Sequence, residues 1–178
     1  MKNFDKGIEE YGAAFTVYHK GKQVVNLWGG WADKRACVRW QKDTMAVSFS
    51  ATKGCAALCV AILVDQGYLC YDDQVTKYWP EFEKHGKDDV TVKQLLSHQA
   101  GLAQVDQPLT LEIMKDRDAI SSVLEDQSPL WLPGTAHGYH ILTHGMLIDQ
   151  LLRRVDPKKR TVGQFFKDEV AEKFVTVG

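Results

Sequence analysis

Residues 50–62 read SATKGCAALCVAI, a serine and a lysine three positions apart followed by a run of small and apolar side chains. One turn of α-helix places positions i and i+3 on the same face, so Lys53 lies within reach of Ser50. A serine hydroxyl attacks a carbonyl only after a base removes its proton, and an uncharged amine is such a base. The stretch therefore predicts a helix with a serine nucleophile at its N-terminal end.

The apolar run continues to Val64 without a charge, which predicts a helix over residues 52–66 that is buried on every side. Gly67 is suited to cap its C-terminal end, and the run is too short to span a bilayer. An alternative interpretation makes Ser50 an ordinary N-cap and Lys53 a solvated side chain. The apolar continuation argues against it, because a lysine at the mouth of a buried helix loses water and the uncharged amine is then favoured.

The composition excludes several functional classes. The chain has 178 residues, 44% hydrophobic and 25% charged, with a formal net charge of −1. These values are typical of one globular domain and give no electrostatic basis for binding nucleic acid or a membrane. The polar N-terminal segment lacks a secretory leader, and no C-x-x-C pair occurs, which predicts a cytoplasmic protein with free thiols and no metal. The four cysteines are Cys37, Cys55, Cys59 and Cys70.

The N-terminal part reads as strands. Residues 11–18 and 23–28 are strand-like and flank the tetrapeptide HKGK, in which Gly21 supplies the positive φ of a tight hairpin. Gly29 and Gly30 are expected to end this hairpin, and residues 31–47 read as loop with a short strand. The remaining sequence has helical spacing, and the predicted helices or helix-bearing segments are 91–96, 108–126, 142–154 and 162–174.

The resulting fold class is α/β, of the α+β kind, in a single partial domain of residues 1–178. Residues 1–33 form an antiparallel hairpin and residues 50–174 a mostly helical region. A two-stranded hairpin alone is marginally stable and needs sheet neighbours. None follows in the sequence, which predicts that the C-terminal strands of the fold are missing.

Five segments together resemble the serine β-lactamase-related superfamily of class C β-lactamases, penicillin-binding D-alanyl-D-alanine peptidases and related carboxylesterases. The segments are AAFTVYHKGK at 13–22, WGGWAD at 28–33, SFSATK at 48–53, LLSHQAGL at 95–102 and WLPGT at 131–135. The resemblance implies a β-lactamase/transpeptidase-like fold that needs no cofactor. It also implies that this chain is the N-terminal portion, because the family's third motif lies on a later strand and is not found after Tyr139.

The same resemblance assigns roles. Ser50 is implied to be the acylated nucleophile, Lys53 helps to deprotonate it, and Tyr139 of GYHI at 138–141 takes the place of the tyrosine in the family's Tyr-x-Asn motif. Ile141 stands where many β-lactamases have asparagine, and it offers a substrate no amide. This difference favours an esterase over a β-lactamase.

The expected function is therefore a serine hydrolase that transfers an acyl group from a small-molecule ester or amide through an acyl-enzyme. His140, beside Tyr139, and Trp131, at the rim of the pocket, are the candidate substrate-binding residues. The alternative is an inactive fragment or a pseudoenzyme that keeps the fold as an interaction scaffold. No nucleic acid or membrane partner is expected, and assembly into a homo-oligomer stays open.

The histidines allow a competing hypothesis. His137, His140 and His144 have spacings that bring imidazoles together on a helix, as in metal sites. A His-Glu-x-x-His signature is absent because Ile141 occupies the glutamate position, so structural histidines around a tyrosine site are favoured. Ser97 and His98 are adjacent and point apart, which predicts a loop packed beneath the site rather than a nucleophile and its base.

Overall fold

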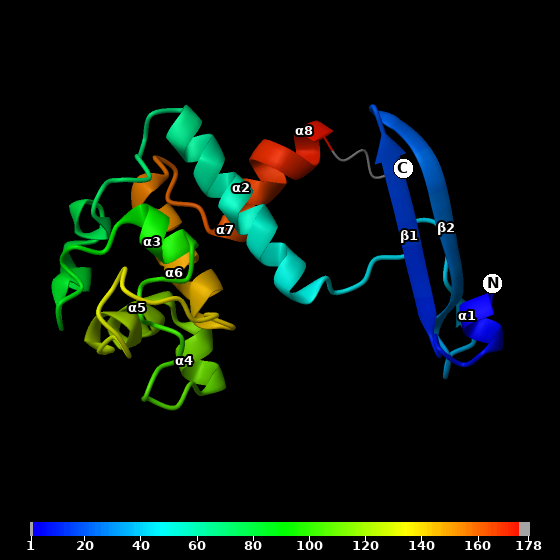
Figure 1. Cartoon of the computed structure of the whole chain (residues 1–178), viewed down its shortest axis with the longest axis horizontal. Helices are drawn as coiled ribbons and strands as arrows, with labels where there is room; N and C mark the ends of the chain where they lie inside the picture. The colour runs from blue at the N-terminus through cyan, green and yellow to red at the C-terminus, as the bar shows by residue number, and fades with distance from the viewer. Residues whose placement is uncertain (1, 175–178) are drawn as a thin grey trace. The chain divides into compact units, whose positions relative to one another are not determined.

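The computed structural model describes residues 2–174 and contains two compact units, Met1–Ser48 and Phe49–Gly178 (Figure 1). The boundary falls in the loop that the sequence places between the strands and the first long helix. The strand unit contains α1 (Lys2–Asp5), β1 (Gly12–His19), β2 (Lys22–Asp33) and β3 (Val38–Arg39). Its three strands form an antiparallel sheet in the order β1-β2-β3, which confirms the predicted hairpin and short third strand.

The hairpin turn follows from its two central residues. Lys20 has φ 48° and Gly21 has φ 75°, so both adopt the left-handed conformation that joins right-handed twisted strands most directly. The register pairs His19 with Lys22 and Val17 with Val25, with an irregularity after Val17. A turn of two residues therefore sets the connection between β1 and β2.

The pairing of β1 with β2 ends at Gly30, as predicted, but strand β2 itself does not end there. Strand β2 continues through both glycines to Asp33, and Gly30 pairs with Gly12. Gly30 has φ 86°, and a Cβ added there would overlap the Tyr11 carbonyl, while a Cβ on Gly12 would overlap the Trp40 ring. The glycines allow close approach of neighbouring backbone instead of ending the strand.

The helical unit contains seven α-helices in its described part, together with short 3₁₀ and π turns. The helices and turns are η1 (Phe49–Ala51), α2 (Thr52–Asp65), η2 (Val75–Lys77), η3 (Pro80–Glu83), α3 (Val92–Leu96), α4 (Leu111–Lys115), α5 (Arg117–Asp126), α6 (Thr143–Val155), α7 (Val162–Phe166), the π-helical turn Lys167–Ala171 and α8 (Glu172–Phe174). The last element, α8, is a single short turn. The segment predicted as one helix-bearing excursion holds two helices, because the Asp116 side chain caps α5 by accepting from Asp118 N and Ala119 N.

Helix α2 ends where the sequence predicts. Gly67 has φ 77°, its N–H donates to the Val64 carbonyl, and Tyr68 N donates to the Leu63 carbonyl. These two bonds form a Schellman motif, which satisfies carbonyls left open at the helix end. The long helix is therefore bounded by local chemistry at its C-terminus.

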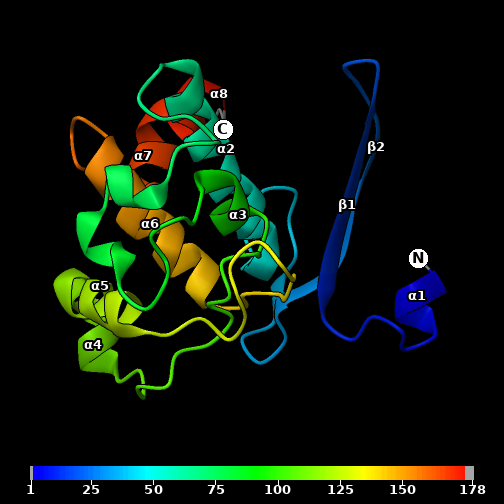
Figure 2. The same ribbon diagram turned by 60° about the vertical axis from the view of Figure 1, so that its left-hand side comes forward.

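The prediction that α2 is buried on every side is wrong. Helices α6 and α7 pack along one side of it (Figure 2), where Cys59 and Leu63 are buried. On the other side Gly54 is exposed and Leu58 keeps 46% of its surface accessible. Apolar side chains surround the helix, but the described part of the helical unit covers only one face. No helix within residues 2–174 has both the length and the hydropathy to cross a bilayer.

A buried lysine completes the helical unit. Lys87 is inaccessible, and its Nζ donates to the Glu125 carbonyl at 2.8 Å and the Gln127 carbonyl at 2.7 Å. Both carbonyls lie at the C-terminal end of α5, where a cation is favoured by the helix dipole. Burial nevertheless lowers the pKa of Lys87 to about 8, since a charge is costly away from water.

Candidate functional site

Ser50 lies in the 3₁₀ turn η1 that leads into α2, and its side chain is exposed. The N-cap of α2 is Ala51, which excludes the interpretation of Ser50 as the cap of this helix. Phe49, one residue earlier, has φ 44°. A left-handed backbone at a bulky residue costs about 1–3 kcal/mol and is found mainly at functional sites.

The Lys53 amine connects two distant segments. Its Nζ lies 3.2 Å from Ser50 Oγ and 2.7 Å from the carbonyl oxygen of Ile141, 88 positions further along the chain. The i,i+3 spacing supplies the first contact, as predicted, whereas the second depends on the tertiary fold. Lys53 is half-buried, so the two contacts form at the edge of the solvent.

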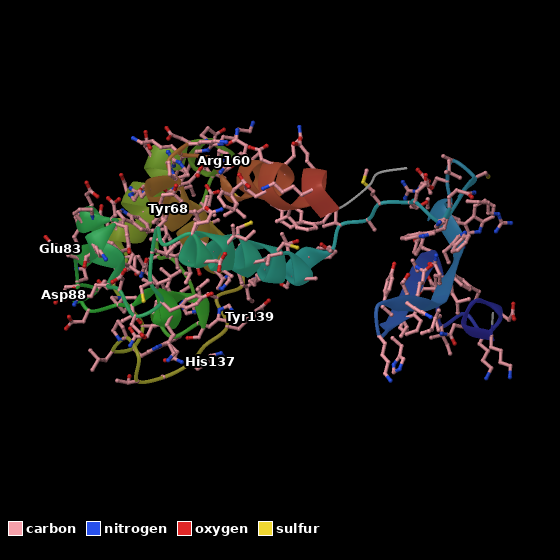
Figure 3. All side chains as sticks on the ribbon, turned by 90° about the horizontal axis from the view of Figure 1, so that it is seen from above. Tyr68, Glu83, Asp88, His137, Tyr139 and Arg160 are labelled. Atoms are coloured by element: carbon pink, nitrogen blue, oxygen red, sulfur yellow. The ribbon has the colours of Figure 1, made fainter. Side chains whose placement is uncertain are left out.

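Tyr139 lies beside the lysine amine. Its ring centroid is 5.0 Å from Lys53 Nζ, and the side chain is 47% exposed. Two hydrogen bonds lower the pKa of the Tyr139 phenol below its ordinary value. The bond with the Ser50 hydroxyl contributes most and the bond with Lys53 comes second. Figure 3 shows Tyr139 and His137 on the same loop of the helical unit. The structure therefore brings the three predicted catalytic side chains together, in an arrangement that can move a proton away from a serine hydroxyl.

His140 is fully buried beneath this loop. Its Nε2 accepts the Leu102 N–H at 3.0 Å, and its Nδ1 lies 2.5 Å from the Gly138 carbonyl. Both ring nitrogens are thus engaged with the backbone, which argues against the predicted contact with a substrate. The position of the ring suits a residue that holds the loop in place.

Trp131 is half-buried and packs against the same loop. A Cβ added to Gly138 would lie 2.5 Å from its ring, so the absence of a side chain at 138 lets the indole approach the backbone. The indole Nε1 is buried and has no hydrogen-bond partner within residues 2–174. The contact with Gly138 places the indole against the loop that carries Tyr139. The predicted role of Trp131 at the rim of the pocket stays a prediction.

The sequence interpretation missed the contact made by His98. Its Nδ1 accepts the backbone N–H of His140 at 3.1 Å. The hydroxyl of its neighbour Ser97, the C-cap of α3, donates to the Lys93 carbonyl at 2.7 Å, which is consistent with the rejection of a Ser97–His98 catalytic pair. The only sequence signal for His98 was its place in LLSHQAGL, which does not reveal its partner.

The metal hypothesis gains no support from these histidines. The rings of His140 and His144 bond to backbone groups, and His137 is exposed. Within the described residues, no group of three His, Cys, Asp or Glu side chains is placed to hold a metal ion.

Comparison with known proteins identifies the relatives of this chain. The chain is 37% identical over 170 residues to the esterase/beta-lactamase LipL of Mycobacterium tuberculosis (strain ATCC 25618 / H37Rv), covering 94% of this chain and 38% of LipL. A crystal structure of a family VIII carboxylesterase shares 42% identity with a TM-score of 0.88, over 96% of this chain and 46% of that one. A penicillin-binding protein homologue from Caulobacter crescentus shares 43% identity with a TM-score of 0.89, over 97% and 46%.

The chain thus spans less than half the length of these relatives. The likeness runs through both the strand unit and the helical unit, and it includes proteins named as esterases, β-lactamases and penicillin-binding homologues. The sequence model described as Beta-lactamase matches residues 2–175, and the chain belongs to that family.

Proposed function

We propose that this chain carries the nucleophile region of a serine hydrolase that forms an acyl-enzyme with an ester or amide, esters being preferred. The observation that carries the proposal is the position of Lys53 Nζ, which contacts Ser50 Oγ at 3.2 Å and lies beside the Tyr139 ring. The membership of the family and its esterase relatives support the same reaction class.

The proposed reaction begins with loss of the Ser50 proton. The proton passes to the Tyr139 phenolate or to the Lys53 amine, while Ser50 Oγ forms a bond to the carbonyl carbon of the substrate. Collapse of the tetrahedral intermediate breaks the bond to the leaving alcohol or amine, which takes up the proton. Water then attacks the acyl-enzyme and releases the acid, with Ser50 regaining its hydrogen.

A lowered Tyr139 pKa favours this step, because the phenolate then forms at a lower pH than in an ordinary tyrosine. The phenolate is the basic form, and contact with Ser50 and Lys53 stabilises it relative to an ordinary tyrosine. The rate of Ser50 acylation is therefore expected to rise with pH through the pKa of Tyr139 and to fall in acid. Replacing Tyr139 with phenylalanine removes this dependence.

The preference for esters rests on Ile141. Its carbonyl binds the lysine amine, but its side chain is exposed and apolar. It therefore offers no hydrogen bond to an amide group, whereas it can contact the alkyl part of an acyl ester. An ester also has a better leaving group than an unstrained amide, so it depends less on protonation of the departing atom.

The test is labelling with a fluorophosphonate, in which Ser50 Oγ displaces fluoride from phosphorus, followed by intact-mass measurement. We expect one adduct on the unchanged chain and none on Ser50→Ala. Lys53→Ala should label about 10²–10⁴-fold more slowly, because general-base assistance contributes about that much. Ser97→Ala, a serine outside the site, should label at the parent rate.

The scaffold alternative makes the opposite prediction. A folded chain, and a version extended to the length of its relatives, would both fail to form an adduct. Comparison of p-nitrophenyl butyrate with a chromogenic cephalosporin then distinguishes the esterase from the β-lactamase: faster turnover of the cephalosporin would contradict the ester preference.

A further inference from the structure

His98 is surrounded by aromatic side chains, Tyr139 among them. Its ring stacks on one histidine, and three further rings lie close to it. The centroid distances are 4.4 Å to His144, 5.0 Å to Tyr139, 5.4 Å to His140 and 5.9 Å to His137. The backbone of His98 is in the left-handed region, with φ 62°. Such a conformation persists at a side-chain-bearing residue only when its surroundings determine it.

Hydrogen bonds to backbone groups determine where the imidazole protons lie. A backbone N–H can only donate, so His98 Nδ1, which binds His140 N, and His140 Nε2, which binds Leu102 N, must both carry lone pairs. A neutral His98 is therefore protonated at Nε2, whereas His140 is protonated at Nδ1 and donates to the Gly138 carbonyl. His144 Nε2 lies 3.2 Å from the Leu96 carbonyl, an acceptor, so it carries that ring's proton.

The surroundings favour these neutral forms. The pKa of His98 is lowered to about 4, chiefly by burial. Smaller contributions in the same direction come from the nearby His144, His140, His137 and Lys53. Burial also lowers the pKa of His140 and of His144. At neutral pH His98 thus keeps the lone pair that accepts the His140 N–H.

The accepted N–H belongs to the peptide that directly follows Tyr139. Two residues after Tyr139, the Ile141 carbonyl binds Lys53 Nζ, which in turn contacts Ser50. The short segment from Tyr139 to Ile141 is therefore held by His98 at one peptide and contributes a ligand to the lysine at another. Displacement of the first peptide would shift both the phenol and the carbonyl.

We propose that His98 is a positioning residue: by accepting the His140 N–H it fixes the Tyr139 peptide, and thereby holds the phenol and the Ile141 carbonyl around the Lys53 amine. The effect on acylation rests on the proposed function, whereas the effect on the geometry of Tyr139 does not. His98 contacts no reacting atom, so its influence passes through the loop.

Two variants separate the acceptor from the backbone strain. Asparagine and glycine both tolerate the left-handed conformation, but only His98→Asn retains an acceptor near the position of Nδ1. The first measurement is the pKa of Tyr139. It is obtained by NMR titration of the full chain with ¹³C-labelled tyrosine, and the Tyr139 signal is assigned by its loss in Tyr139→Phe. We expect the value to remain low in His98→Asn and to rise by at least half a unit towards that of free tyrosine in His98→Gly.

The second measurement is the rate of labelling by the fluorophosphonate. His98→Asn is expected to react within about threefold of the parent, and His98→Gly at least tenfold more slowly. A ¹⁵N-histidine spectrum of the unchanged chain, recorded at neutral pH, should show His98 protonated at Nε2 and His140 at Nδ1. This spectrum tests the proposal even when a variant does not fold.

The outcomes distinguish the two proposals. An unchanged Tyr139 pKa in folded His98→Gly, an equal shift in both variants, or a His98 protonated at Nδ1 would overturn the positioning role. Parent-like labelling of His98→Gly would overturn it too, while leaving the hydrolase proposal intact. A third outcome is that the Tyr139 pKa changes as expected but no chain, not even the parent, is labelled. This result would support the positioning role of His98 and contradict the proposed hydrolase function.

Discussion

The helical unit and the strand unit bury their apolar side chains to different extents. In the helical unit, Leu147 and Phe165 are at most 1% exposed and belong to one continuous core. In the described part of the strand unit no residue is buried to that degree, and Phe15 and Leu27 are 62% and 63% exposed. The helical unit therefore contains both a core and every candidate site residue, so the stability of the site should depend on helix packing more than on the sheet.

A matched pair of leucines gives the largest expected effect. Leu147→Ala removes a fully buried side chain and should lower the free energy of unfolding by about 2–5 kcal/mol, because lost burial and a cavity both count against the folded state. Leu27→Ala removes a mostly exposed side chain and should change it by less than about 0.5 kcal/mol. Urea unfolding followed by circular dichroism measures both. Equal losses would show that the sheet stabilises the chain as strongly as the helical core.

Replacing the buried Lys87 should change the free energy of unfolding by an intermediate amount. Lys87→Met leaves the Glu125 and Gln127 carbonyls without their donor and should cost about 1–3 kcal/mol in urea unfolding near pH 7. The control is Lys84→Met, an exposed lysine paired with Asp126, with an expected loss below about 1 kcal/mol.

The pH dependence of Lys87 has a defined sign. Its pKa is about 8 in the folded chain and near the ordinary lysine value when unfolded, so between these values the unfolded chain binds more protons. Stability conferred by Lys87 should therefore increase as the pH rises from about 8 towards 10. The difference between the parent and Lys87→Met isolates this effect from other titrating groups. A difference that shrinks over this range would contradict the assignment.

Substitutions at two glycines in the helical unit should have effects of opposite sign. Gly145 lies within α6, and a Cβ added there would meet open space. Gly145→Ala should therefore raise the free energy of unfolding by about 0.5–1 kcal/mol, measured by thermal unfolding. Gly138→Ala places a Cβ against the Trp131 ring and should destabilise the chain by about 1 kcal/mol or more. Gly138→Ala should also slow Ser50 labelling, because it displaces the Tyr139 loop. Unchanged labelling would show that this contact does not position the loop.

Features set by local chemistry could be predicted from the sequence. The hairpin turn at Gly21, the end of α2 at Gly67 and the Ser50–Lys53 contact each depend on residues within a few positions. The cap of α3, where Thr91 and Gln94 bond reciprocally, is of the same kind.

Features set by long-range contacts could not. The continuation of β2 through Gly30 depends on the backbone of the adjacent strand, and the exposed face of α2 depends on which helices pack beside it. The Lys53–Ile141 and His98–His140 contacts join segments 88 and 42 positions apart. A pattern of residue types identifies such side chains but carries no information on which backbone atom they meet.

The contact between Lys53 and Ile141 has a consequence for how this site can diverge. The lysine binds a main-chain oxygen, and every amino acid supplies that atom. The exposed isoleucine side chain can therefore be exchanged without depriving the amine of its partner. Under the proposed function, the side chain of Ile141 would contact the acyl group while its carbonyl holds the lysine, so that a change of side chain at this position would alter the acyl preference and leave the lysine contact in place.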